Sequence, residues 1–95
     1  TVERIIAEVG RTFGVSPEDI RSSKRSSQIS NARQIAMYLI RRMTSMSLND
    51  IGKEFGDRDH STILHSLDKV ESTMRSDPAF AEKVKEITTN INSKK

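Results

Sequence analysis

Apolar residues recur every three or four positions along most of the chain, which is the spacing of one face of an α-helix. No segment shows the sustained alternation of apolar and polar residues that is typical of a half-buried strand. The pattern therefore predicts an all-α fold, a compact bundle of five to six helices in a single domain covering residues 1–95. We expect its core to contain Val2, Ile5, Ile6, Val9, Phe13, Ala32, Ile35, Ala36, Leu39, Ile40, Met43, Leu48, Ile51, Phe55, Ile63, Leu67, Val70, Met74, Phe80, Val84, Ile87 and Ile91.

Capping residues predict where these helices begin and end. Gly14 follows the first apolar stripe and predicts the end of that helix. The segment SPED, residues 16–19, predicts the start of a short helix that ends near Arg21. The serine-rich stretch SSKRSSQI, residues 22–29, lacks periodicity and predicts a loop. We expect later helices to begin at Ser30, at Ser47, near Asp59 and at Asp77, and the final lysines to fray.

The composition is that of an ordinary globular protein and excludes several kinds of site. Hydrophobic residues make up 34% and charged residues 31% of the 95 residues. The absence of cysteine excludes disulfides, thiolate metal sites and cysteine nucleophiles. His60 and His65 are five positions apart and do not share a helix face, so we expect no metal site. No apolar run is long enough to span a bilayer and no signal peptide opens the chain, so a cytoplasmic location is expected.

The distribution of charge is more informative than its total, which is +3. No acidic residue occurs between Asp19 and Asp50. A basic surface of this kind is either simply solvated or suited to a polyanion, such as nucleic acid or anionic lipid, and charge alone does not decide between them. The basic residues of this interval are Arg21, Lys24, Arg25, Arg33, Arg41 and Arg42.

Residues 47–75 have the pattern of a helix-turn-helix. A short helix closes at Gly56, a few residues that include Asp57 and Arg58 form a turn, and a longer amphipathic helix follows. On a helical wheel of about 100° per residue, its polar side lies opposite the apolar stripe and has Asp68 only at its margin. This side can approach base edges and phosphates without repelling them, and it carries Ser61, Thr62, His65 and Lys69.

The stretch DRDHST, residues 57–62, also invites a catalytic interpretation. Asp59, His60 and Ser61 are consecutive, so on a helix they point outward at different angles and cannot form the hydrogen-bonded relay of a triad. The chain has no glycine-rich nucleophile elbow and no phosphate-binding loop. We therefore predict that the chain is not an enzyme. Its polar groups lie instead at a helix tip, the place where helix-turn-helix proteins contact bases.

The segment IGKEFGDRDHSTILHSLDKVE, residues 51–71, resembles the signature of the C-terminal DNA-binding domain of the bacterial replication initiator family DnaA. The pair KR at residues 24–25 and the segment RQIAMYL at residues 33–39 match upstream in the same order. The resemblance covers essentially the whole chain. It implies sequence-specific binding to a nine-base-pair box near 5′-TTATNCACA at replication origins, with a recognition helix in the major groove and a basic loop in the minor groove.

The resemblance also implies roles for individual residues. Arg25 would enter the minor groove beside Lys24, while Asp59, His60 and Ser61 would read bases in the major groove. An arginine suits a narrow A·T minor groove because negative potential is concentrated there, and a carboxylate can accept from the cytosine amine. The DNA backbone would be held by Arg33, Gln34, Leu48, Asn49, Thr62 and Lys69, with His65 as an additional contact.

Alternative interpretations stay open for some residues and for the function of the chain. Asp59 is also a suitable N-cap, and both roles can hold if its two oxygens take different partners. Asn49 stands where proline is common in the family, Ser61 where threonine is frequent, and Asn31-Ala32 where proline or serine often precedes the RQ pair. The alternative functions are a helix-turn-helix transcriptional regulator and a basic module that binds acidic phospholipids.

The resemblance finally implies partners and cofactors. We expect double-stranded DNA as the partner, together with other domains of a longer initiator from which this domain is excised. Acidic phospholipids are the alternative partner, and the isolated domain is expected to be monomeric. No cofactor is expected here, because ATP would bind a nucleotide-binding domain that this chain lacks.

Overall fold

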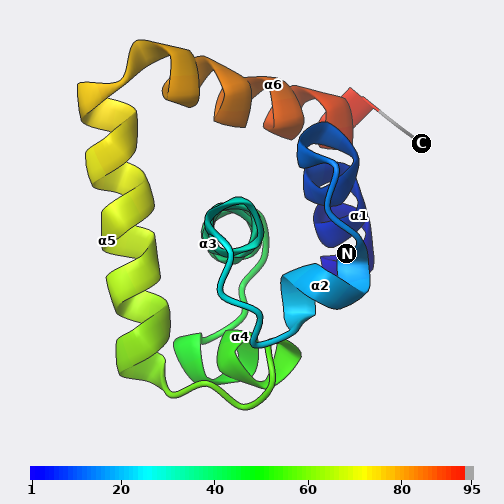
Figure 1. Ribbon diagram of the computed structural model, residues 1–95, viewed down its shortest axis with the longest axis vertical. Coiled ribbons are helices and arrows are strands. Elements are labelled where there is room, and N and C mark those ends of the chain that lie inside the picture. Colours follow the sequence, from blue (N-terminus) through cyan, green and yellow to red (C-terminus); the bar gives the residue numbers. More distant parts are fainter. Residues whose placement is uncertain (94–95) are drawn as a thin grey trace.

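The structure, a computed structural model, describes residues 1–93, and every regular element in that range is an α-helix. The central helix α3 is seen end-on in Figure 1, where the other five helices surround it. This arrangement confirms the predicted all-α bundle. The helices are α1 (Val2–Phe13), α2 (Pro17–Arg21), α3 (Ser27–Met43), α4 (Leu48–Glu54), α5 (His60–Ser76) and α6 (Pro78–Ser93).

Helix α3 is the centre of the core because it packs against α1, α2, α4 and α5. A helix covered on several sides cannot show a single apolar stripe, and α3 is buried beyond the stripe that its periodicity predicts. Met37 and Tyr38 are buried in addition to the expected residues, whereas the expected Met43 is only partly buried. The fully enclosed part of α3 runs from Ala32 to Ile40 and is interrupted only by the half-buried Gln34.

Most of the predicted helix starts are confirmed by hydrogen bonds from backbone N–H groups to capping side chains. The Oγ of Ser16 accepts from the N–H of Asp19 at 3.1 Å, and Ser47 accepts from Asp50 at 3.1 Å. Asp77 caps α6, because its Oδ1 accepts from the N–H groups of residues 79 and 80. The predicted end of α1 is also correct, since its C-cap residue is left-handed at φ 68°. The final lysines lie outside the described residues.

The predicted start of α3 at Ser30 is wrong. The helix begins at Ser27, and its N-cap Ser26 accepts from the N–H of Ile29 at 3.3 Å. Ser26, Ser27 and Ser30 offer similar caps, so long-range contacts select among them. Ile29 packs against the core, and Gln28 Nε2 donates to the carbonyl oxygen of residue 13 at 2.7 Å. The loop between α2 and α3 is therefore shorter than predicted and covers residues 22–26.

The turn between α4 and α5 packs directly onto the backbone of Gly52. The carbonyl oxygen of Gly52 accepts from the N–H groups of Phe55, at 3.1 Å, and Arg58, at 3.0 Å. A Cβ atom at this position would collide with the carbonyl oxygen of Arg58. The chain reverses through Gly56 and Asp57, which have φ values of 78° and 60°. Close approach at Gly52 thus sets the angle at which α5 leaves the turn.

We predict that Gly52→Ala destabilises the domain by about 1–3 kcal/mol, because the new methyl group must displace backbone rather than a flexible side chain. Each kcal/mol corresponds to roughly 4–8 °C in Tm for a domain of this size. Thermal unfolding followed by circular dichroism measures the change. Lys53→Ala, at the next and exposed position of α4, is the control and should leave Tm nearly unchanged. Equal Tm values for Gly52→Ala and the native chain would contradict the packing described here.

Candidate nucleic-acid interface

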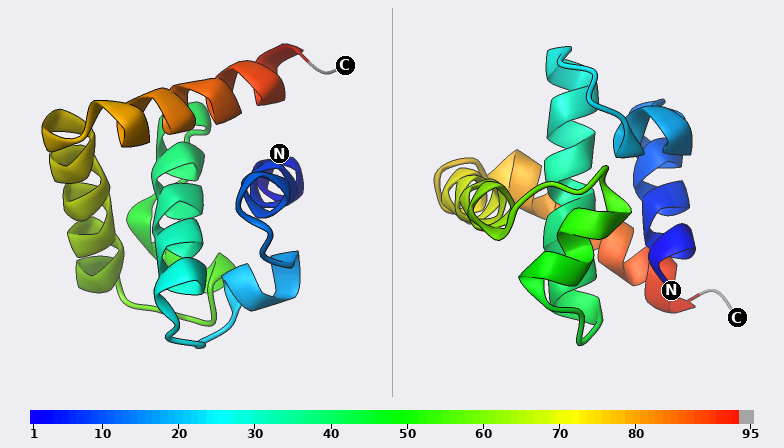
Figure 2. Two further views of the ribbon diagram at one scale, coloured as in Figure 1. Left: turned by 45° about the horizontal axis from the view of Figure 1, so that its top comes forward. Right: turned by 90° about the horizontal axis from the view of Figure 1, so that it is seen from below.

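Two segments that are far apart in sequence lie at one end of the molecule. The loop of residues 22–26 and the turn that leads into α5 run side by side below the N-terminal end of α3 (Figure 2, left). A hydrogen bond joins the two segments, since Nη2 of Arg58 donates to the carbonyl oxygen of Ser22 at 3.1 Å. The basic loop and the first turn of α5 are therefore held as neighbours.

Between the loop, α3 and α5 lies an open hollow of about 270 Å³, which we call the loop-side hollow. Its walls contain three arginines and several hydroxyl, amide and imidazole groups, but no carboxylate. Such a surface can donate to an anion from several directions. Its lining residues are Ser23, Arg25, Ser30, Arg33, Gln34, Met37, Arg58, Thr62, His65 and Ser66. Five predicted contact residues, Arg25, Arg33, Gln34, Thr62 and His65, thus meet in one place.

The two basic side chains of the loop differ in their surroundings. Lys24 pairs with Asp19 at 2.8 Å, but its side chain is 62% exposed and the pair is a surface one of little energetic worth. Arg25 is exposed and has neither a hydrogen bond nor an ion pair with any described residue. The Arg25 guanidinium is therefore accessible to an anion from outside the domain, and no bond within the described residues has to be broken first.

A second open hollow of about 340 Å³ lies on the other side of the α5 tip, and we call it the α4-side hollow. It brings the predicted contacts Leu48, Asn49 and His60 together with Arg41 and Ser47, again without a carboxylate. Arg41 was not among the predicted site residues, and its Nη1 donates to the carbonyl oxygen of Met46 at 2.9 Å. The acid-free interval of the sequence contained the signal for Arg41, but only the fold places it near α5.

The outer face of α5 agrees with the predicted wheel. Ser61, Thr62, His65 and Lys69 are exposed, while Ile63, Leu67 and Val70 are buried. Sequence reasoning missed Leu64, which is 47% exposed and is the large apolar side chain that stands out on the described surface. Leu64 lies one turn beyond His60 on the outward side of the helix, so the face is polar around one apolar group.

Asp59 is the N-cap of α5, and its Oδ1 accepts from the N–H of Thr62 at 2.9 Å. This N–H, together with the Thr62 hydroxyl and the neighbouring His60, lowers the pKa of the Asp59 carboxyl. Among the described residues, no hydrogen bond links Asp59 to His60 or His60 to Ser61, so the three do not form a catalytic relay. The cap uses one carboxylate oxygen, and the carboxylate is exposed at the tip of α5.

Arg33, for which the resemblance implies a contact with the DNA backbone, lines the loop-side hollow but is almost completely buried. It is only 5% exposed, and its guanidinium donates to protein oxygens in and beside the α2–α3 loop. A phosphate would have to compete with these bonds. Lys69 lies where it was predicted, and it lines a separate hollow of about 250 Å³ together with Gln34 and Asn31.

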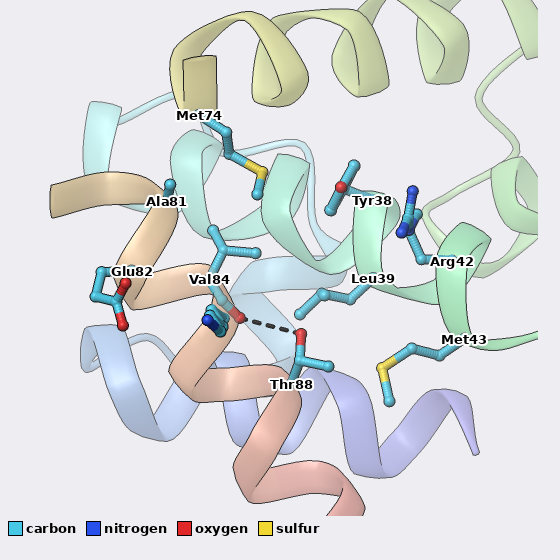
Figure 3. A pocket seen from close by; sticks show the side chains of 10 residues that line it. Tyr38, Leu39, Arg42, Met43, Met74, Ala81, Glu82, Val84 and Thr88 are labelled. Carbon is cyan, nitrogen blue, oxygen red and sulfur yellow. Dashed lines mark hydrogen bonds between the residues drawn. The ribbon is translucent and has the colours of Figure 1, made fainter. Parts of the chain in front are cut away.

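An apolar pocket of about 430 Å³ lies among α3, α5 and α6, and Figure 3 shows Met43, Met74 and Leu39 around it. The α3 and α5 residues that line this pocket lie near the C-terminal ends of these helices, and none of the lining residues belongs to the loop-side or α4-side hollow. Across residues 1–93, no helix is long and apolar enough to cross a membrane, and no group of three His, Asp or Glu residues could hold a metal ion. The polar end of the molecule is therefore the candidate site.

Comparison with known proteins agrees with this geometry. The family model described as the bacterial dnaA protein helix-turn-helix matches residues 2–70. The chain belongs to this family. Within DnaA the matched part is the C-terminal helix-turn-helix domain, which is a DNA-binding module and not a catalytic one. The resemblance inferred from residues 24–71 is thereby confirmed.

Relatives and a solved structure extend the match over nearly the whole chain. The chain is 47% identical over 92 residues to the chromosomal replication initiator protein DnaA of Lachnoclostridium phytofermentans, and covers 20% of that protein. It is 43% identical over 90 residues to the corresponding protein of Streptococcus pyogenes serotype M5, again covering 20% of its length. A crystal structure of a DNA replication initiation factor superposes with a TM-score of 0.84 at 34% identity, over 95% of this chain and 27% of that one.

We predict a pH-dependent contribution of Asp59 to stability. Because its pKa is lowered in the folded state, the charged cap stabilises the domain above the ordinary Asp pKa, about 3.9, and this contribution is lost as pH falls through the lowered value. Asn is an equally good cap but does not titrate. The difference in Tm between the native chain and Asp59→Asn should therefore change below about pH 4, where the native carboxyl takes up a proton. A difference that is constant at every pH would contradict the charged cap.

Proposed function

We propose that the chain is a sequence-specific double-stranded DNA-binding domain that reads nine-base-pair boxes near 5′-TTATNCACA at replication origins. Helix α5 enters the major groove and Arg25 enters the adjacent minor groove, in the initiation and regulation of chromosome replication. The observation that carries the proposal is the juxtaposition of a cation without a partner in the described structure and a helix tip, on either side of a hollow without carboxylates. Two adjacent grooves of a duplex are separated by one sugar-phosphate strand. A hollow lined by cations and hydrogen-bond donors, without carboxylates, can accommodate that strand.

The loop-side hollow would hold that strand. Ser23, Gln34 and Thr62 can donate hydrogen bonds to phosphate oxygens, and His65 can do so from the second turn of α5. Lys24 would exchange its surface pair with Asp19 for a phosphate at little cost. These contacts fix the register of the protein on the duplex and make binding dependent on salt.

The tip of α5 would read bases. Asp59 can accept from a cytosine N4 amine, His60 can donate to a purine, and Ser61 can do either. Leu64 adds an apolar contact one turn further along, where it can pack on the C5 methyl group of a thymine. The α4-side hollow, with Leu48, Asn49 and the additional cation Arg41, would lie against the opposite strand. Lys69, which shares a hollow with Gln34, would hold the backbone further along α5 on the side of the loop-side hollow.

We further propose that this domain works as part of a longer initiator. Its relatives are named chromosomal replication initiator proteins, and the chain spans about one fifth of their length. Nucleotide binding would then belong to another part of the protein. The cations of the two hollows also permit binding to acidic phospholipids, but Leu64 is a single apolar side chain and does not make an amphipathic membrane face.

We predict that the domain binds a duplex carrying the box about 10³-fold more tightly than a scrambled duplex of equal length. Affinity should fall steeply with salt for both duplexes, because both require phosphate contacts. Fluorescence anisotropy at two salt concentrations measures both quantities. Equal affinity for the two duplexes would overturn the proposal and leave a general polyanion binder, and tight binding to anionic vesicles alone would favour the lipid alternative. Preference for an unrelated operator sequence would favour a transcriptional regulator.

We predict that Leu64→Ala weakens binding to the box by about 1 kcal/mol but hardly affects the scrambled duplex, because it removes an apolar contact with a thymine methyl group. Replacing single thymines of the box by uracil removes one methyl group at a time. At one position this replacement should weaken the native domain and leave Leu64→Ala unaffected. Ser72→Ala, at an exposed position further along α5, is the control. If every thymine replacement affects native and Leu64→Ala domains equally, Leu64 does not contact a thymine methyl.

A further inference from the structure

Two arginines hold the backbone of the basic loop from behind. The guanidinium of Arg33 donates from Nε to the carbonyl oxygen of Ile20 at 2.7 Å, from Nη1 to that of Lys24 at 2.9 Å, and from Nη2 to that of Asp19 at 3.0 Å. Nη2 also reaches Ser22 Oγ at 3.4 Å. One side chain from α3 thus collects carbonyl groups from the end of α2 and from the loop.

Arg58 completes this arrangement from the other side. Its Nη2 donates to the carbonyl oxygen of Ser22 at 3.1 Å, and its Nε donates to that of Phe55 at 3.1 Å. The backbone N–H of Arg58 is bound to Gly52, and the next residue is the α5 cap Asp59. Arg58 therefore links the loop that carries Arg25 to the turn that leads into α5.

This arrangement is electrostatically unfavourable, because it buries the guanidinium charge of Arg33 close to that of Arg58. Arg33 is 5% exposed, and burial together with the nearby charge of Arg58 lowers its pKa. Asp19 offsets only part of this effect. Helix ends expose carbonyl groups without partners, and α2 is too short to satisfy its own. A planar guanidinium spreads five N–H donors over three nitrogens in a fixed fork, whereas lysine has three donors on one nitrogen and a neutral amide has two.

We infer that Arg33 and Arg58 are positioning residues: they fix the distance and direction from Arg25 to the tip of α5, so that one duplex can occupy both grooves at once. This inference rests on the proposed function, and it assigns Arg33 to the protein scaffold in place of a DNA contact. It also gives Arg58 a role beyond the turn. The specific consequence is that both residues act on DNA binding through Arg25.

The test is a double-mutant cycle between Arg58→Lys and Arg25→Ala on the box duplex. Lysine keeps the charge but loses the two-pronged contact with Ser22 and Phe55. Arg58→Lys should weaken binding on the order of tenfold in the native background, which is typical of coupled residues in one hydrogen-bond network. In the Arg25→Ala background it should cost less than about twofold. Equal costs in the two backgrounds would overturn the inference.

Arg42→Lys is the matched control, because Arg42 is exposed over the ring of Tyr38, outside both hollows, and should leave binding unchanged. Arg33→Lys is the second variant, with Tm measured for each. If Arg33→Lys folds, its cost should likewise vanish without Arg25. If it does not fold, the cycle with Arg58 still decides, since Arg58 is only half-buried.

A measurement without DNA separates this inference from the proposed function. In NMR relaxation experiments on the free domain, Arg58→Lys should increase the mobility of residues 22–26 and leave the later turns of α5 as they are. Unchanged loop mobility would overturn the positioning role whatever the domain binds. If the native domain fails to prefer the box while the loop becomes mobile, the proposed function fails and the structural role of Arg58 stands.

Discussion

The structure depends on the enclosure of α3. Apolar side chains lie on several sides of α3 and have to be shielded from water. The helices packed around α3 shield them by burying their own apolar stripes against it. Because α3 is enclosed, its N-terminal part reaches both the α2–α3 loop and the face of α5. Arg33 and Gln34 lie at this junction, so the same helix that organises the core also supports the polar end of the molecule.

The polar end cannot be stabilised in the way the core is. Groups that must meet a duplex have to stay exposed, and the two hollows that they line contain no carboxylate to offset their mutual repulsion. Backbone carbonyl groups of residues 19, 20, 22 and 24 bind the guanidiniums of Arg33 and Arg58, and Asp19 adds a partial offset from beside the loop. Carbonyl oxygens balance the buried donors without adding a carboxylate that would repel phosphate.

Much of the fold was predictable because its signals are local. Ser16, Ser47 and Asp59 cap helices in the structure, and the apolar stripes of α1, α5 and α6 face the core as expected. The start of α3 was not predictable, since several serines offer equal caps and the packing of Ile29 decides. The residues missed at the site, Arg41 and Leu64, carry no local signal that separates them from other basic or apolar positions.

The family resemblance and the structural contacts of Arg33 suggest two different roles for this residue. An arginine in a basic interval is compatible with a phosphate contact, but an arginine whose nitrogens already bind four protein acceptors is compatible with a different role. A domain that binds two adjacent grooves, as we propose for this one, needs a fixed separation between its two DNA-binding parts, and that separation is a tertiary property. It has to be held by groups that lie behind the DNA-facing surface. The loss of such groups can resemble the loss of a DNA contact, although they touch only the protein.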